Sequence, residues 1–134
     1  MSVLTSDQLG QLAKDYQKIA SELLKFKLEN ANNMSITEFQ DLGSRITLIV
    51  HNSNILAAMA TYQTAEDISD SLNTLTDSAD KIDATLKKIQ KVQDIIDIAA
   101  MAINVGTNIL SGNLKGTVQS IGEFAKKIGV AVKI

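Results

Sequence analysis

The sequence predicts an all-α protein, either an antiparallel helical bundle or a set of elongated helical hairpins. The chain of 134 residues contains no proline and only 4% aromatic residues, so nothing interrupts long helices and little favours a sheet. Apolar residues recur at alternating intervals of three and four along most of the chain, which is the periodicity of a helix with one buried face. The length suits a single domain over residues 1–134, organised as about four helices of which the third is long.

An N-terminal helical hairpin is expected over about residues 5–62. The first helix should begin near Thr5 or Ser6 and end near Asn30, and its apolar residues form one line: Leu9, Leu12, Tyr16, Ile19, Leu23 and Phe26. Ser35 followed by Glu38 has the spacing of a capping box, which places the start of the second helix there. The second helix carries a matching line: Phe39, Leu42, Ile46, Ile49, Ser53, Leu56 and Ala60. The two lines are expected to face each other across a short loop.

A long third helix is expected over about residues 65–110. The register of the apolar residues changes after the second helix, which places a turn near Thr61–Thr64. A continuous helix is the alternative, because neither glycine nor proline lies between Gly43 and Gly106. At about 1.5 Å per residue the third helix would be about 70 Å long, and the polar residues at 90–97 mark the place where it is expected to bend.

An apolar C-terminal hairpin is expected over about residues 95–134, with a turn in which Gly112 adopts the left-handed conformation that ends many helices. No ionisable side chain lies between Ile98 and Leu114, and this helix is apolar on two opposite faces. One face comprises Ile96, Ala100, Ile103 and Leu110. The other comprises Ile95, Ile98, Ala102, Val105 and Ile109. The last helix can cover only one of them, so the other is expected to need a partner. The first two helices could cover it if the third helix bends, and otherwise another chain is needed.

The surplus apolar face predicts a non-enzymatic protein that acts by self-association or by binding another protein. The candidate face combines residues of both helices of the hairpin: Ile95, Ile98, Ala102, Val105, Ile109, Val118, Ile121, Phe124 and Ile128. Nothing in the sequence indicates a small-molecule substrate.

A membrane-active protein is the alternative function. An uncharged helix, a Gly-Asn turn and a basic amphipathic helix adjoin in the C-terminal hairpin, and such a helix can lie at an anionic membrane surface. The layout from about Ala65 onward resembles that of the α-helical pore-forming toxins, which pair long amphipathic helices with a concealed apolar hairpin. This resemblance implies a hairpin that stays hidden until it meets a bilayer, and it assigns no residue a role.

A small cytosolic inhibitor or immunity-type protein is the second alternative. Its basic partner would meet an acidic face in the middle of the chain: Glu66, Asp67, Asp70, Asp77, Asp80 and Asp83. Basic residues gather instead near the C-terminus: Lys115, Lys126, Lys127 and Lys133. Four lysines are far fewer than a nucleic-acid-binding surface needs, so nucleic acid is not an expected partner.

No catalytic or metal-binding pattern is present in the sequence, so neither enzymatic activity nor a cofactor or metal is expected. His51 is the only histidine and is placed on the surface side of its helix, and the chain has no cysteine. The acidic pairs one helical turn apart lack both the Glu-x-x-His pattern of di-iron bundles and the glycine of a calcium loop. The start of the chain does not look like a signal peptide. A cytoplasmic location is therefore expected, with export by another route left open.

Overall fold

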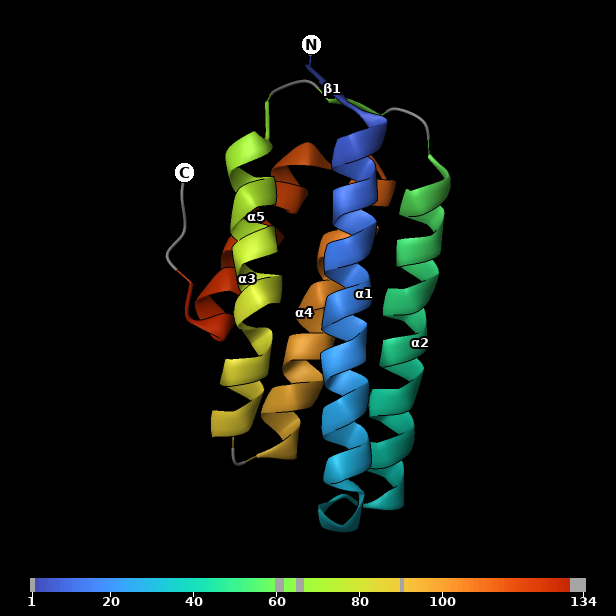
Figure 1. The fold of residues 1–134 in the computed structure, drawn as a ribbon, viewed down its shortest axis with the longest axis vertical. Coiled ribbons are helices and arrows are strands. Elements are labelled where there is room, and N and C mark those ends of the chain that lie inside the picture. The colour runs from blue at the N-terminus through green and yellow to red at the C-terminus, as the bar shows by residue number, and fades with distance from the viewer. Residues whose placement is uncertain (1, 60–61, 65–66, 90, 131–134) are drawn as a thin grey trace.

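A computed structural model describes residues 2–59, 62–64, 67–89 and 91–130, and it is a bundle of α-helices (Figure 1). The described residues form five α-helices: α1 (Ser6–Glu29), α2 (Ile36–Ala58), α3 (Ser69–Lys88), α4 (Val92–Leu110) and α5 (Leu114–Ile128). A 3-10 turn, η1 (Ala31–Asn33), joins α1 to α2. Helices that follow one another in the chain run in opposite directions (Figure 1). The prediction of an all-α antiparallel bundle is confirmed.

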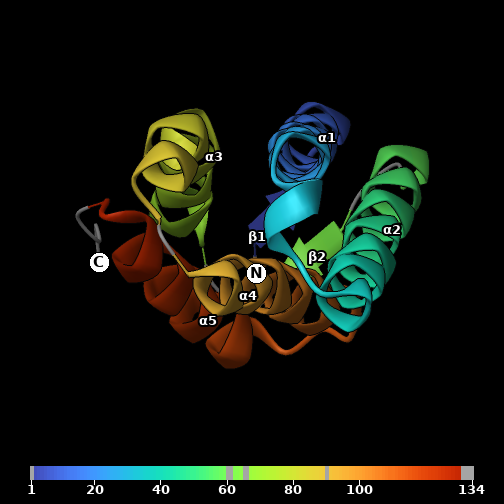
Figure 2. The same cartoon turned by 90° about the horizontal axis from the view of Figure 1, so that it is seen from below.

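The five helices form a closed ring when the bundle is seen along its axis (Figure 2). Around the ring, α1 packs against α2 and α3, α5 packs against α3 and α4, and α2 packs against α4. The inside of the ring is filled by one apolar cluster to which every helix contributes. Its largest fully buried side chains are Tyr16, Phe124, Leu9, Leu12, Ile19, Leu23, Leu42, Ile49, Leu56, Leu75, Ile82 and Ile95.

The N-terminal hairpin has the boundaries and caps that the sequence predicts. Thr5 caps α1 by accepting a 3.2 Å hydrogen bond from the Gln8 backbone N–H. At the start of α2, the Ser35 hydroxyl oxygen accepts from the Glu38 N–H at 3.1 Å, and the Glu38 carboxylate accepts from the Ser35 N–H at 2.9 Å. This reciprocal pair satisfies two of the backbone donors that a helix start leaves free.

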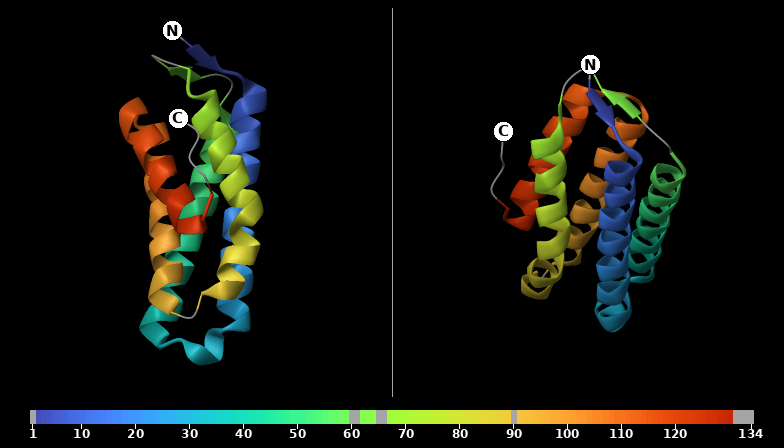
Figure 3. Two further views of the ribbon diagram at one scale, coloured as in Figure 1. Left: turned by 90° about the vertical axis from the view of Figure 1, so that its left-hand side faces the viewer. Right: turned by 45° about the horizontal axis from the view of Figure 1, so that its top comes forward.

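Two short strands lie at the end of the bundle where α1 begins and α2 ends (Figure 3). Strand β1 (Ser2–Leu4) pairs antiparallel with β2 (Tyr62–Thr64), so that Ser2 is opposite Thr64. The sequence places a turn near Thr61–Thr64, of which residue 61 lies outside the described residues. The interruption after α2 is confirmed, since the chain between α2 and α3 contains an extended segment in place of a continuous helix.

The prediction of one long third helix is wrong, because the segment forms two helices, α3 and α4. Ile89 ends α3 with ψ of 132°, and Lys91 precedes α4 with ψ of 126°. Both residues have extended backbone, which no α-helix can contain. The break lies at the edge of the segment 90–97 in which bending was expected. It is a reversal of direction, and it returns α4 to the side of α1 and α2.

The turn between α4 and α5 is built from polar residues of the uncharged segment. Gly112 has φ of +77°, which confirms the left-handed conformation predicted for it. The Asn113 side chain caps α5 by accepting from the Gly116 N–H at 3.0 Å. Asn108 then donates to both the Gly116 carbonyl and the Ser120 hydroxyl, at 3.2 Å each. Asparagine in this otherwise apolar stretch thus fixes the hairpin geometry.

The end of α5 is fastened to α3 and α4 by three side chains. The Thr85 hydroxyl donates to the Ile128 carbonyl at 2.8 Å, and the Lys81 ammonium donates to the Gly129 carbonyl at 2.7 Å. These carbonyls would otherwise lack partners at the end of the helix, and a cation there also interacts favourably with the helix dipole. Lys127 forms a 3.3 Å ion pair with Asp94 of α4.

Candidate interaction surfaces

The apolar face predicted to need a partner lies in the core of the bundle. Eight of its nine members are at most 3% exposed: Ile95, Ile98, Ala102, Val105, Ile109, Ile121, Phe124 and Ile128. Val118 is half-buried. The expectation that this face is left uncovered is therefore corrected, and these side chains are not available on the surface of the folded chain.

The cover comes from α1 and α2, the alternative that the sequence leaves open for a third helix that bends. The break after α3 lets α4 run beside α2, and Gly106 lies against side chains of α1 and α2. A Cβ atom built on Gly106 would lie 2.7 Å from the Asn52 side-chain nitrogen and 2.9 Å from the Tyr16 ring. Side chains from both N-terminal helices thus reach the uncharged segment, while α5 covers its other side.

The second apolar face of α4 is the one that stays partly accessible. Ile96 is buried at 5%, whereas Ala100, Ile103 and Leu110 are half-buried. The sequence therefore predicts correctly that this helix has two apolar faces. The face that was expected to be uncovered is buried, and the other face is the partly accessible one.

Exposed apolar side chains gather on α1 and α2, which the sequence analysis did not single out as a contact surface. Among the described residues, the large apolar side chains classed as exposed are Leu24 (43%), Leu28 (63%), Ile36 (77%), Leu48 (49%), Val50 (40%) and Ile55 (37%). All six belong to the α1–α2 hairpin. A signal for them is present in the sequence, since each is an apolar residue that falls outside the core-facing line of its own helix.

A shallow apolar groove of about 290 Å³ runs between α1 and α2 on the outside of the bundle. It is lined by Leu24, Lys27, Gly43, Ile46, Thr47 and Val50. The Lys27 ammonium crosses from α1 to lie 4.1 Å from the centre of the Phe39 ring, a cation–π contact. It passes directly over Gly43, where a Cβ atom would be 2.8 Å from the Lys27 nitrogen. Lys27, the one lysine that lines the groove, is thereby held against the Phe39 ring.

The predicted acidic face lies on α3 and the residues before it, and several of its members already have partners. Asp80 forms an ion pair with Lys18 at 3.1 Å, and Asp83 forms one with Lys87 at 3.3 Å. Asp67 accepts hydrogen bonds from the Ser69 hydroxyl and N–H, which lower the pKa of Asp67. Asp70 and Asp77 are exposed. Glu66 lies outside the described residues.

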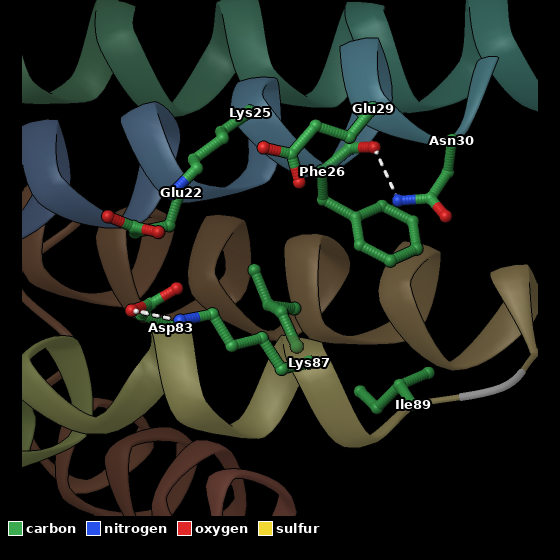
Figure 4. Close-up of a pocket in the computed structure, with 9 residues that line it drawn as sticks. Glu22, Lys25, Phe26, Glu29, Asn30, Asp83, Lys87 and Ile89 are labelled. Carbon is green, nitrogen blue, oxygen red and sulfur yellow. Dashed lines mark hydrogen bonds and ion pairs between the residues drawn. The ribbon is translucent and has the colours of Figure 1, made fainter.

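A polar pocket of about 140 Å³ opens between the lower ends of α1 and α3 (Figure 4). Its wall combines carboxylates and lysines with an apolar floor: Glu22, Lys25, Phe26, Glu29, Asn30, Asp83, Leu86, Lys87 and Ile89. Asn30 donates to the Phe26 carbonyl at 3.0 Å and so completes the end of α1. The pocket contains no histidine, since His51 is exposed on α2. No arrangement of a nucleophile and a base exists among its residues.

Asp15 is a buried carboxylate between α1 and α3 that sequence reasoning missed. It is 4% exposed and accepts from the Gln11 amide at 2.9 Å and from the Thr76 hydroxyl at 2.6 Å. Burial raises the pKa of Asp15, against the opposite effect of these two hydrogen bonds. In the sequence, the signal for this burial is that Asp15 stands next to Tyr16, at the edge of the apolar line of the first helix.

The described part of the chain contains no group of three or more His, Cys, Asp or Glu side chains that could hold a metal ion. None of the described helices is both long enough and apolar enough to cross a membrane. Comparison of the chain with protein-family models, curated proteins and solved structures finds no match.

Proposed function

We propose that this protein is a non-enzymatic association module whose contact surface is the outside of the α1–α2 hairpin. The observation that carries the proposal is the location of the six exposed large apolar side chains, all of which belong to these two helices. Single exposed apolar residues are ordinary, but here they are confined to one pair of helices, and two of them, Leu24 and Val50, line the groove between these helices. Exposed apolar side chains grouped in this way are typical of protein-binding sites. The proposal moves the contact surface from the C-terminal hairpin, where sequence reasoning put it, to the N-terminal hairpin.

The burial of the remaining apolar residues supports the same surface. The inner sides of α4 and α5 are occupied by α1, α2 and α3, and opening them would expose a core to which all five helices contribute. The α1–α2 groove needs no such rearrangement, because it is accessible in the folded chain. A surface that is already exposed requires no free energy of opening before it can bind.

Site-specific photocrosslinking in the cells that make the protein tests this proposal. A photoreactive phenylalanine derivative replaces Leu28 or Ile36 on the proposed surface, and in control proteins it replaces Asn73 of α3 or Thr107 of α4. Asn73 and Thr107 are exposed but lie on other helices. We expect crosslinked species from Leu28 and Ile36 and few from the controls. Equal yields from all four positions would contradict the proposal.

A further inference from the structure

We infer that the ring of helices opens along the contact between α1 and α3, and that it opens more often as the pH rises. Three features of this contact support the inference: a buried charge, a cavity at each end, and extended backbone on both sides of α3. Opening would expose the apolar side chains that α3 buries in the closed ring: Leu72, Leu75, Ala79, Ile82 and Leu86. The inference does not depend on the function proposed above, since the α1–α2 groove is accessible in the closed ring.

The buried charge of the described residues lies in the α1–α3 contact. It belongs to Asp15, whereas the other buried polar side chains of the described helices are neutral amides and hydroxyls. The Asp15 carboxylate accepts hydrogen bonds from Gln11 and Thr76. In the described part of the chain Asp15 has no ion pair, since Lys18 of the same contact pairs with Asp80 at 3.1 Å. Burial of a carboxylate without an ion pair costs free energy, and opening returns this carboxylate to water.

A cavity lies at each end of the same contact. Near the start of α1 and α3, a cavity of about 80 Å³ opens between Gln8 and Leu12 on one helix and Leu72 and Asn73 on the other. Near the end of the two helices lies the polar pocket of about 140 Å³ (Figure 4). Atoms that line a cavity lack packing partners on that side. The two helices therefore hold each other less tightly than a pair that is packed along its full length.

Extended backbone flanks α3 on both sides, so that the helix can move as a unit. Strand β2 precedes it, and Ile89 and Lys91 after it have ψ of 132° and 126°. Changes of backbone angle in such connecting residues break no hydrogen bond within a helix. The side chains of Lys81 and Thr85 fasten α3 to the end of α5. We therefore expect α3 to leave α1 while it keeps its contact with α5.

Asp15 makes the opening depend on pH. Burial raises the pKa of Asp15 in the closed ring, against the opposite effect of the hydrogen bonds from Thr76 and Gln11. The charges that act on it are those of Asp80 and Lys18, one from each helix of the contact and opposite in effect. In the open form the carboxylate meets water, so the closed ring binds the proton more tightly. Opening therefore increases as the pH rises through the closed-state pKa of Asp15 and levels off above it.

Thiol labelling tests the inference, because the chain has no cysteine and a single introduced thiol reports on one position. Ala79→Cys places the thiol on the buried side of α3. Ala99→Cys is the matched control on α4, which packs against α2 and α5, and both alanines are 0% exposed. We expect dithiodipyridine to label Ala79→Cys about ten times faster than Ala99→Cys at pH 7, because a local opening needs less free energy than unfolding of the whole bundle. Equal labelling rates would overturn the inference.

The pH dependence is tested by adding Asp15→Asn to the Ala79→Cys chain. Each rate is divided by the rate of the same chain unfolded in urea, which removes the effect of pH on the thiol itself. We expect labelling of Ala79→Cys to slow as the pH falls from 7 to 4. Asp15→Asn should slow it about five-fold at pH 7 and remove most of its pH dependence. Asp7→Asn changes an exposed carboxylate of the same helix and should leave the rate nearly unchanged. An equal or faster rate with Asp15→Asn would overturn the pH dependence.

Hydrogen–deuterium exchange supplies a second test in which no buried residue is replaced. Lys18→Cys and Asp80→Cys replace the exposed ion pair of the contact, and a short bifunctional thiol reagent joins them. An amphipathic helix depends on its packing for stability, so the α3 amides of the unbridged protein should exchange before those of α2 and α4. The bridge should slow α3 to the rate of α2. If the bridge leaves the exchange of α3 unchanged, α3 does not open from α1 and the inference is wrong.

Discussion

The Tyr16 hydroxyl donates a 2.6 Å hydrogen bond to the backbone carbonyl of Ala102, which joins α1 to α4 across the core. Tyr16 is 0% exposed, and burial raises the pKa of its phenol, so the group stays a neutral donor. We predict that Tyr16→Phe lowers the free energy of unfolding by about 1 kcal/mol, the usual net value of one intramolecular hydrogen bond. Urea denaturation measures this. A loss near zero would mean that the bond contributes nothing to stability.

Gly106 must be a glycine for Tyr16 and Asn52 to reach α4. A Cβ atom there would lie 2.7 Å from the Asn52 nitrogen and 2.9 Å from the Tyr16 oxygen. We predict that Gly106→Ala lowers the free energy of unfolding by about 1–3 kcal/mol through overpacking. Gly10→Ala is the matched control, because an added Cβ at Gly10 meets nothing within 4 Å. It should raise the free energy by up to about 1 kcal/mol, since alanine favours a helix. Thermal unfolding that shows the same sign for both would contradict the structure.

Asp15 should make the contact between α1 and α3 more stable as the pH falls. Burial raises the pKa of Asp15 in the folded state above its unfolded value, so the folded protein binds the proton more tightly. The contribution of this one residue to stability therefore increases as the pH falls through the folded pKa and levels off below the unfolded pKa of about 3.9. We predict that Asp15→Asn, which removes the buried charge, is more stable than wild type at pH 7 by up to about 1 kcal/mol.

The difference between wild type and Asp15→Asn should shrink as the pH falls toward 4, when urea denaturation is repeated across the pH range. Asp7→Asn is the control, because Asp7 is exposed in the first turn of the same helix. A negative charge there interacts favourably with the helix dipole. The control should lose a few tenths of a kcal/mol at pH 7, opposite in sign to Asp15→Asn. If Asp15→Asn is less stable than wild type at pH 7, the hydrogen bonds from Gln11 and Thr76 outweigh the cost of burial.

The contribution of the Ser35 capping box to the free energy of unfolding should be measurable with a single substitution. Its hydroxyl oxygen accepts from the Glu38 N–H at 3.1 Å, and we predict that Ser35→Ala lowers the free energy of unfolding by about 1 kcal/mol. Ser44→Ala makes the same chemical change at an exposed position within α2 and should be neutral or slightly stabilising, because alanine is the better helix former. Equal effects of the two substitutions in chemical denaturation would argue against the cap.

Local signals in the sequence were sufficient for most of the helix boundaries. The Ser35 capping box, the Asn30 stop and the left-handed Gly112 all act within a few residues, so each can be recognised without tertiary structure. The break at Ile89–Lys91 has a weaker signal, since the polar residues at 90–97 predict a bend there but not a reversal of direction. No glycine or proline marks it, and its position is explained by packing, since it lets α4 return to α1 and α2.

The accessible apolar face of α4 was harder to predict than the fold, because coverage depends on which helices become neighbours. The sequence shows correctly that the uncharged helix has two apolar faces, but the choice between Val105 and Ile103 as the exposed one depends on where α2 packs. Val105 is 0% exposed and Ile103 is half-buried.

The position of α5 between α3 and α4 sets an order in which the helices can pack during synthesis. During synthesis α5 is the last of the five helices to emerge, and Phe124 and Ile128 fill the inside of the ring beside helices made earlier. The α1–α2 hairpin needs only contacts close in sequence and can form early. The sides of α3 and α4 that face α5, by contrast, stay uncovered until α5 is made, and during that interval they are exposed to aggregation or to chaperones.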